Sequence, residues 1–251
     1  MKQIFRFFCL VLLFLLICSP CCAGVDFNGD ADYIDCGTSL LGDGVSTITI
    51  TVWVKIDGAQ NAGIIYLGTF TGAQGEIAIN MDGPNLFIRV NGGAGAAVIG
   101  YTDTSSWHCL TMTFDSAAGN NNGKLYVDGS LELQLTNATA LDLNGLKTTI
   151  GAYYSPSYTL DGKITEVAIW NVALTQDEIS LLASSMLKGM PLQIRTPTER
   201  VLYLPLDDLQ EGGNLAGATF VDRSGNGNDG TGSDANASGG QGRAEEVLSY
   251  P

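Results

Sequence analysis

The stretch DGKITEVAIWNVALTQDEI, residues 161–179, predicts a turn, then a β-strand, then the start of a short helix. Polar and apolar side chains alternate along the strand, so it should have two different faces. One face is expected to carry Ile164, Glu166, Ala168 and Trp170. The other is expected to carry Thr165, Val167 and Ile169.

The helix that follows has a clear beginning and end. Thr175 is a good N-cap, and Glu178 three residues later completes a capping box. Lysine, glycine and proline between positions 188 and 191 favour an end there. Its apolar stripe comprises Ile179, Leu182, Met186 and Leu187. We expect this helix to cover an edge of a β-sandwich.

Glu166 is the exception within the strand, because it shares a face with apolar residues. A buried carboxylate is costly unless a cation or a hydrogen-bond donor satisfies it. The sequence therefore predicts a partner for Glu166, either a cation or a nearby donor.

The rest of the chain has the pattern of an all-β protein. Residues 47–55 alternate as TITITVWVK, which is typical of a central sandwich strand. Further short strands are separated by turns rich in glycine, aspartate and proline, and Asp128-Gly129-Ser130 predicts a hairpin. An apolar content of 45% is enough for a substantial core.

Six of these pieces occur in an order that resembles a known family. Besides residues 161–179 they include FNGDADYIDCG, TITITVWVK, WHCLTMTF, LYVDG and TIGAYY, which lie within residues 25–187. The order is similar to that of LamG-like (laminin G and pentraxin-like) domains of the concanavalin A-like lectin/glucanase superfamily. The resemblance implies a two-sheet antiparallel jelly roll with one short helix on its C-terminal side, over residues 24–190.

Residues 1–23 have the composition of a secretory signal peptide. Lys2 and Arg6 precede an apolar run at positions 7–17, which is too short to span a membrane comfortably. We therefore expect export, to the medium or to the cell surface. A lipid-modified Cys21 or Cys22 remains the alternative. Export would permit a disulfide between Cys36 and Cys109, which the spacing alone leaves open.

The chain is strongly acidic, with a formal net charge of −14. This charge disfavours nucleic acid and anionic membranes as ligands, and no membrane insertion is expected after the signal is removed. The acidity suits a cation-binding protein or a well-solvated extracellular domain.

The C-terminal tail, residues 191–251, has two readings. Positions 201–208, VLYLPLDD, predict an edge strand, and DRSGNGNDG at positions 222–230 begins a Gly/Asn/Asp-rich extension. The tail either completes the same sandwich or begins another domain. Positions 212–242 have little apolar content, so a loop-rich extension is expected there.

Nothing in the sequence predicts catalysis. His108 is the one histidine and lies in a predicted strand, with no motif to supply a nucleophile and an orienting carboxylate. The alternating carboxylates of the superfamily's endoglucanases, Glu-x-Asp-x-x-Glu, are missing from the sequence. The chain is therefore expected not to be an enzyme.

A structural calcium ion is one candidate cofactor. Calcium prefers several carboxylate, amide and carbonyl oxygens. The candidate ligands are Asp26, Asn28, Asp30 and Asp32 in the opening turn, with Glu166. A second oxygen-rich loop contains Asp222, Asn226, Asn228 and Asp229. Solvated turn residues without a metal are the alternative for both.

A sugar site would need aromatic faces with a few polar groups beside them. Tyr153, Tyr154 and Tyr158 gather around Pro156 in one predicted loop, next to the edge where LamG-like domains bind ligands. These tyrosines are the candidate ligand-binding residues. Packing against their own domain is the alternative.

These features favour an exported, non-catalytic LamG-like binding module that recognises carbohydrate or a protein surface outside the cell. One alternative is a structural or adhesive protein whose sandwich assembles with other chains. The other is a glycoside hydrolase with an unrecognised site. The same fold serves all three, so the site has to decide between them.

Overall fold

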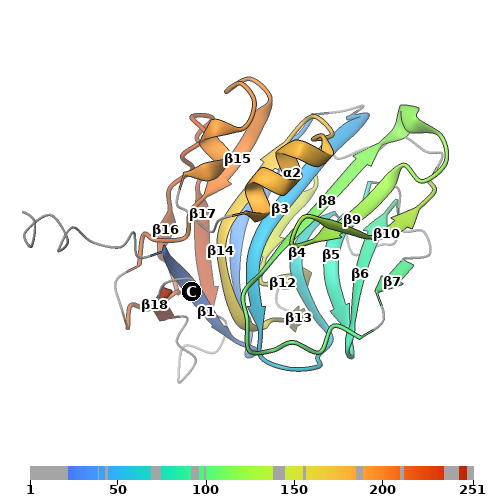
Figure 1. Ribbon diagram of the computed structural model, residues 1–251. Helices are drawn as coiled ribbons and strands as arrows, with labels where there is room; N and C mark the ends of the chain where they lie inside the picture. Colours follow the sequence, from blue (N-terminus) through green and yellow to red (C-terminus); the bar gives the residue numbers. More distant parts are fainter. Residues whose placement is uncertain are drawn as a thin grey trace, which may run out of the picture.

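The computed structural model describes residues 22–38, 40–42, 45–68, 75–91, 96–98, 100–137, 145–154, 157–184, 189–209, 212–234 and 243–247. Two large antiparallel sheets face each other in these residues, which confirms the predicted jelly-roll sandwich (Figure 1). Most of the predicted signal peptide, residues 1–21, lies outside the described residues.

The first sheet contains the stretch around which the fold is built. Its strands in spatial order are β10 (Ser130–Leu135), β9 (Gly123–Val127), β8 (His108–Asp115), β3 (Thr47–Ile56), β14 (Asp161–Trp170), β1 (Cys22–Asn28) and β18 (Arg243–Val247). A further strand, β15 (Arg200–Leu204), also pairs with β14. Since β14 pairs with three strands, it lies in the middle of this sheet.

The second sheet packs against the first. Its strands in spatial order are β16 (Thr219–Phe220), β17 (Gly230–Asp234), β2 (Asp32–Thr38), β11 (Lys147–Ile150), β4 (Ala62–Gly68), β5 (Ile77–Asp82), β6 (Asn85–Val90) and β7 (Ala96–Val98). A separate hairpin joins β12 (Ala152–Tyr154) to β13 (Ser157–Thr159). Two 3-10 turns, η1 (Ser116–Ala118) and η2 (Met190–Gln193), complete the described elements.

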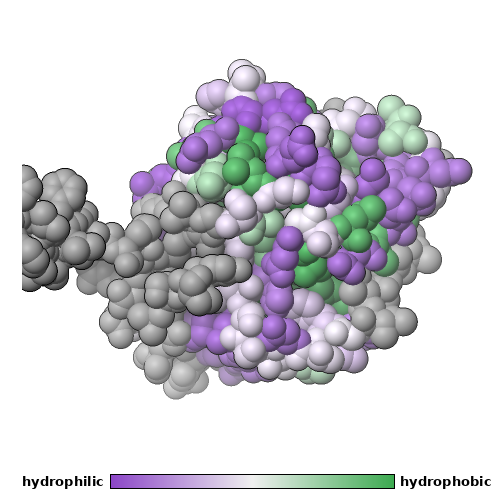
Figure 2. All heavy atoms as spheres, viewed as in Figure 1, coloured by the Kyte–Doolittle hydropathy of each residue, from purple (hydrophilic) through white to green (hydrophobic). Residues whose placement is uncertain are grey.

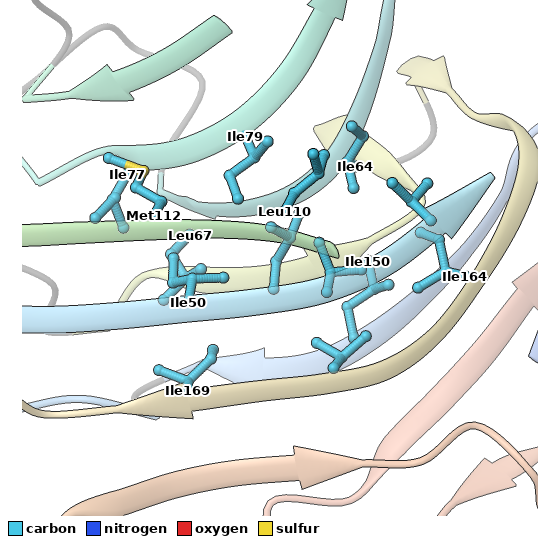
Figure 3. Packing of buried hydrophobic residues seen from close by; sticks show 14 of the residues in the cluster. Ile50, Ile64, Leu67, Ile77, Ile79, Leu110, Met112, Ile150, Ile164 and Ile169 are labelled. Carbon is cyan, nitrogen blue, oxygen red and sulfur yellow. The ribbon is translucent and has the colours of Figure 1, made fainter. Parts of the chain in front are cut away.

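Isoleucine, leucine and valine side chains from both sheets fill the space between them. Figure 3 shows Ile50 and Leu110 from the first sheet packed among Leu67 and Ile79 from the second. On β3 the alternation is as predicted, because Ile48, Ile50, Val52 and Val54 all lie in this core. Burial of these apolar side chains is the main source of the stability of the sandwich.

On β14 the predicted alternation is wrong, because a β-bulge interrupts it. The pairing of β14 with β3 shifts register between Thr165 and Ala168, and Glu166 takes a left-handed φ of 52°. An extra residue in one strand reverses the direction of every side chain beyond it. Ile164 and Ile169 therefore both enter the inter-sheet core (Figure 3), whereas Trp170 packs on the opposite face.

The bulge marks the place where β14 changes partners. Residues 161–164 pair with β1, and residues 167–170 pair with β15. The two partner strands thus share one edge of β14, one after the other. At the change of partner the Thr165 hydroxyl donates to the carbonyl of Pro205, which stabilises the junction.

The helix α2 (Gln176–Ala183) begins as predicted. Thr175 is its N-cap and Glu178 completes the capping box. Ile179 and Leu182 are buried beside Trp170, outside the inter-sheet core. Met186 and Leu187, also predicted for the apolar stripe, lie outside the described residues. Figure 1 shows α2 lying across the outer face of the first sheet.

The tail contributes strands to both sheets. β15 pairs with β14 in the first sheet, and β17 pairs with β2 in the second. Leu215 and Phe220 are fully buried in the inter-sheet core. Residues 212–234 are mainly loop, as predicted, with two short strands, and these two apolar residues anchor them to the sandwich.

Cys36 and Cys109 are free thiols that lie on different faces of the sheets. Cys36 lies in the inter-sheet core, and Cys109 lies beside Trp53 on the outer face of the first sheet. The face that carries α2 is mainly hydrophilic, with small apolar patches between polar residues (Figure 2). Among the described residues, no helix has the length and apolar character needed to cross a membrane.

Candidate ligand-binding pocket

The hairpin β12–β13 lies against β4, on the face of the second sheet that points away from the core. A glycine on β4 makes this close approach possible. A Cβ atom built on Gly63 would lie 2.0 Å from the backbone nitrogen of Tyr153, so no larger residue fits there without a shift. The hairpin thereby brings its tyrosines over the outer faces of β4, β5 and β6.

A pocket of about 300 Å³ opens between this hairpin and the sheet. Its lining consists of Asn61, Ala62, Asn80, Met81, Asp82, Arg89, Tyr153 and Tyr158. The strand alternation explains which side chains reach it. On β5 the side chains of Ile77 and Ile79 enter the core, so Asn80 faces the pocket.

Two tyrosines, Tyr153 and Tyr158, form one wall of the pocket, and the buried Tyr66 packs against Tyr153. The ring centroid of Tyr153 lies 4.8 Å from that of Tyr66 and 6.4 Å from that of Tyr158, the latter in an edge-on arrangement. The Tyr153 hydroxyl donates a hydrogen bond to Glu76. Burial, together with this carboxylate, raises the pKa of Tyr153 above its ordinary value. Tyr153 is therefore a fixed, protonated part of the wall.

Tyr158 is the exposed member of the group. Its side chain is 54% exposed, and its φ of 53° lies in the left-handed region, which is uncommon for a large aromatic residue. Strained residues of this kind often occur where a side chain has to be presented to a ligand. Tyr158 presents such an aromatic surface at the pocket.

Two polar residues in the pocket lack the hydrogen bonds that their burial calls for. Asn80 is only 6% exposed, and its Oδ1 atom has no hydrogen-bond partner among the described residues. The buried Nε atom of Arg89 also has none there. Buried polar groups are nearly always paired, so both atoms are suited to receive a ligand.

The structure brings together two of the three predicted ligand-binding tyrosines, Tyr153 and Tyr158, in one pocket. The side chain of Tyr154 lies outside the described residues. Sequence reasoning missed Asn80 and Arg89. Both are polar residues that alternate with core residues in the strand sequences IAINMD and NLFIRV. This alternation could have indicated that they face away from the core.

The acidic turn predicted for calcium is held by contacts within the protein. The Asp26 carboxylate pairs with Lys163 at 2.9 Å, and Asn28 Oδ1 accepts from the Asp30 backbone nitrogen at 2.9 Å. Asp32 is fully buried, and burial with Asp234 nearby raises its pKa to about 6. No group of three or more metal-binding side chains occurs among the described residues.

Glu166, the fifth predicted calcium ligand, does not lie with the turn. Along β14 it is five residues from Asp161, which pairs with Asn28, and this spacing corresponds to roughly 16 Å. Its carboxylate instead accepts from the Tyr203 hydroxyl at 2.8 Å and the Gly189 nitrogen at 3.3 Å. The five residues therefore do not fit one calcium site, and Glu166 has donors as its partners.

The second oxygen-rich loop fastens the tail. Asp222 accepts from the backbone nitrogens of Tyr203 at 2.9 Å, Ser224 at 2.8 Å and Asn228 at 3.0 Å. The side-chain amide of Asn226 donates to the carbonyl of Arg200 at 2.7 Å. The polar side chains of this loop therefore form hydrogen bonds with strand β15 and with the loop's own backbone.

The structure places two carboxylates beside His108, which no sequence motif had indicated. Its Nδ1 atom lies 2.6 Å from Asp128 Oδ2, and its Nε2 atom lies 3.4 Å from Asp103 Oδ2. The neighbouring thiol of Cys109 is 1% exposed, and burial raises its pKa to about 11. A buried thiol that stays protonated at neutral pH is a poor nucleophile.

The fold and the order of its motifs agree with a comparison against protein families. The profile of the concanavalin A-like lectin/glucanases superfamily, in its laminin G form, matches residues 28–180. The chain belongs to this superfamily. No curated protein sequence matches the chain.

Several solved structures have a fold similar to that of this chain. A heptameric SAP-like pentraxin from Limulus polyphemus has 15% identity and a TM-score of 0.53, covering 65% of this chain and 82% of the pentraxin. A proposed carbohydrate-binding protein from Bacteroides ovatus has 20% identity and a TM-score of 0.61. It matches 92% of this chain, which spans 61% of that protein.

A third structure with a similar fold is the CBM40 of a Ruminococcus gnavus IT-sialidase, bound to α2,3-sialyllactose. It has 14% identity and a TM-score of 0.50, covering 64% of this chain and 96% of that domain. At these identities the comparisons establish the fold. Carbohydrate-binding domains are thus among the structures that this superfamily member resembles.

Proposed function

We propose that this protein is an exported, non-catalytic LamG-like module that binds carbohydrate in the pocket between the β12–β13 hairpin and the second sheet. The observation that carries the proposal is the pocket itself. It combines an aromatic wall of Tyr153 and Tyr158 with the amide oxygen of Asn80, which has no hydrogen-bond partner in the described part of the chain.

This combination suits a sugar. The apolar faces of a sugar ring pack against aromatic side chains, while its hydroxyl groups require hydrogen-bond partners fixed in place. The Oδ1 atom of Asn80 is an acceptor for one hydroxyl hydrogen, and the exposed ring of Tyr158 is available for packing.

The carboxylates around the pocket support binding rather than hydrolysis. Glycoside hydrolysis uses two carboxyl groups about 5 to 9.5 Å apart. Glu76 directly precedes β5 and Asp82 ends it, and six residues of extended chain correspond to roughly 20 Å. Glu76 also accepts the hydrogen bond of Tyr153, so it is already engaged in shaping the wall.

A glycan array tests the proposal. The wild type should bind at least one glycan, and Tyr158→Ala should weaken that binding by about tenfold or more, because an aromatic packing face is lost. Leu131→Ala is the matched control, since Leu131 is a similarly exposed apolar residue on β10 of the other sheet. It should bind as the wild type does.

Two results would count against this function. Binding to no glycan would refute carbohydrate recognition, and equal binding by Tyr158→Ala and the wild type would place the site elsewhere. Release of a reducing sugar from any bound glycan would show that the protein is an enzyme.

Export is the second part of the proposal, and it rests on the composition of residues 1–23. The mass of the mature protein purified from its source organism would test it. Cleavage near Ala23, or a lipid-modified cysteine there, is the expected result. An unprocessed chain inside the cell would refute export.

A further inference from the structure

We infer that the pocket recognises a sugar that carries a carboxylate group, such as a uronic or sialic acid, with Arg89 as the anchor of that group. The inference rests on the carbohydrate-binding function proposed above. It adds the chemical class of the ligand and the direction in which the ligand lies.

Arg89 differs from the other arginines whose side chains the structure describes. Arg195 pairs with Glu178 at 2.5 Å, and Arg223 pairs with Asp208 at 3.0 Å. Arg200 donates to the carbonyls of Pro191 and Leu192. The guanidinium of Arg89 has neither an ion pair nor a hydrogen bond among the described residues.

Arg89 lies in the wall of the pocket, where a bound ligand could supply the missing acceptor. Its Cζ atom lies 5.4 Å from the centre of the Tyr153 ring, which holds the guanidinium beside the wall of the pocket. Its pairing partner on the neighbouring strand β5 is Ala78, which is fully buried and offers no hydrogen-bonding side chain. Arg89 is thus held in place, although no protein acceptor among the described residues satisfies it.

A carboxylate is the acceptor that fits. A guanidinium presents a planar fork of N–H donors that matches the two oxygens of a carboxylate, and such charge-assisted pairs are stronger than neutral hydrogen bonds. A buried donor such as Nε costs free energy when it is left unpaired, so a ligand that supplies an acceptor gains that amount. The nearby Glu76 carboxylate accepts from Tyr153, and a neutral sugar would bring no charged acceptor to Arg89.

The charges along the pocket also give the ligand a direction. Asp82 lies four residues along β5 from Ala78, which is opposite Arg89, and this corresponds to roughly 13 Å. A carboxylate placed near Asp82 would be repelled, whereas hydroxyl groups can donate to it. The acidic ring should therefore lie at Arg89, and neutral rings of the same glycan should extend toward Asp82 and Asn61.

Matched glycan pairs test the inference. Glycans that contain uronic or sialic acid are arrayed beside their methyl esters, in which the charge is removed and the skeleton is kept. The wild type should prefer the acids, and Arg89→Gln should bind them about 10- to 100-fold more weakly, the range expected for a lost charged hydrogen bond.

Lys124→Gln is the control for charge, because it removes one positive charge from β9 in the other sheet. It should keep the wild-type preference for the acids, and thermal unfolding should show that both variants are folded. Tyr158→Ala separates this inference from the function on which it rests. It should weaken the binding of acids and esters alike.

The outcomes are distinct. Binding of acids and esters with equal affinity, or an unchanged affinity in Arg89→Gln, would overturn the inference while leaving a neutral-sugar site in place. Binding of no glycan of either kind would overturn both the inference and the proposed function.

Discussion

His108 lies between two carboxylates where β8 begins. The hydrogen bond with Asp128 is the main cause that raises the pKa of His108 above its ordinary value, and Asp103 adds to it. The ring of Tyr101 packs edge-on at a centroid distance of 5.4 Å. These contacts hold the loop before β8 against the hairpin β9–β10, away from the pocket.

This arrangement predicts a pH-dependent stability. A histidine with a raised pKa in the folded state contributes stability that is fully present below its unfolded pKa, about 6.5. The contribution is lost as the pH rises through the folded pKa. In urea unfolding, His108→Gln should therefore lose more free energy of unfolding at pH 6 than at pH 9. An equal loss at both pH values would contradict the ion pair.

Ionised Asp32 should lower the stability of the folded protein, whereas protonated His108 raises it. The raised pKa of Asp32 reflects an unfavourable environment for the charged carboxylate. Between its unfolded pKa near 4 and its folded pKa of about 6, rising pH lowers the stability of the protein. In EDTA at pH 7, Asp32→Asn should raise the free energy of unfolding by up to about 3 kcal/mol. At pH 3 the gain should vanish, since Asp32 is then protonated in both states.

The exposed Asp57→Asn is the control, because Asp57 is not among the charges that raise the pKa of Asp32, and little change is expected from it. Repeating the measurement with added calcium tests whether Asp32 of the acidic turn holds an ion. An ion held by Asp32 would stabilise the wild type and not Asp32→Asn. A calcium-dependent rise in the melting temperature of the wild type alone would restore a metal site at this turn, with ligands other than Glu166.

For single residues, the sequence predicted the aromatic members of the candidate site but missed its polar members. The clustered Tyr153 and Tyr158 are visible as a local pattern, whereas Asn80 and Arg89 come from two strands and meet only in the folded sheet. Glu166 was correctly expected to need a partner. Its partner Tyr203 lies 37 positions away in the tail, a contact that no local pattern indicates.

Among the elements, the hairpin β12–β13 decides whether the pocket exists. It is short, and its position depends on the close contact with Gly63. Its backbone is also tied to the sheet where the Gly151 nitrogen donates to the carbonyl of Ile64 at 2.9 Å. The site is therefore built by one glycine and one hairpin on an otherwise regular sheet.

Gly63→Ala tests this role. The added methyl group would collide with the Tyr153 backbone, so the hairpin should shift away from β4. We expect a loss of about 1 to 3 kcal/mol in the free energy of unfolding, together with loss of glycan binding. Gly42→Ala, where a Cβ atom meets nothing within 4 Å, should change neither. Retained binding in Gly63→Ala would show that the hairpin does not form the site.

The elements themselves were largely predictable, with one systematic failure. The strand at 47–55 and the capped helix at Thr175 follow from local patterns of alternation and capping. The bulge at Glu166 does not, because it arises where β14 leaves β1 and pairs with β15. A change of partner is a property of the whole sheet, so reading β14 alone assigned Trp170 to the wrong face.

At the scale of the whole molecule, the strands that the structure describes after α2 are part of the sandwich. Strands from the tail lie in both sheets, and the polar loop around Asp222 fastens them through hydrogen bonds to the backbone. This part of the tail is mainly loop, and both its hydrogen bonds and the buried Leu215 and Phe220 hold it against the sandwich. The tail and the sandwich should therefore unfold together.

Asp222→Ala tests this cooperativity. It removes the acceptor of several buried donors, so the free energy of unfolding should fall by about 3 kcal/mol. All three tryptophans lie outside the tail. Their fluorescence should nevertheless report the lowered midpoint, in a single transition. The exposed Asp57→Ala should be neutral. A separate early transition, with unchanged tryptophan fluorescence, would show that the tail unfolds alone.

The most direct test of the central claim is to locate a bound glycan. NMR chemical-shift mapping with the best-binding glycan of the array would do so in the intact protein. We predict that the largest shifts occur at Asn80, Arg89, Tyr153 and Tyr158, with α2 and β10 unaffected. Shifts that cluster elsewhere, or that are unchanged in Tyr158→Ala, would contradict a carbohydrate site between the hairpin and the second sheet.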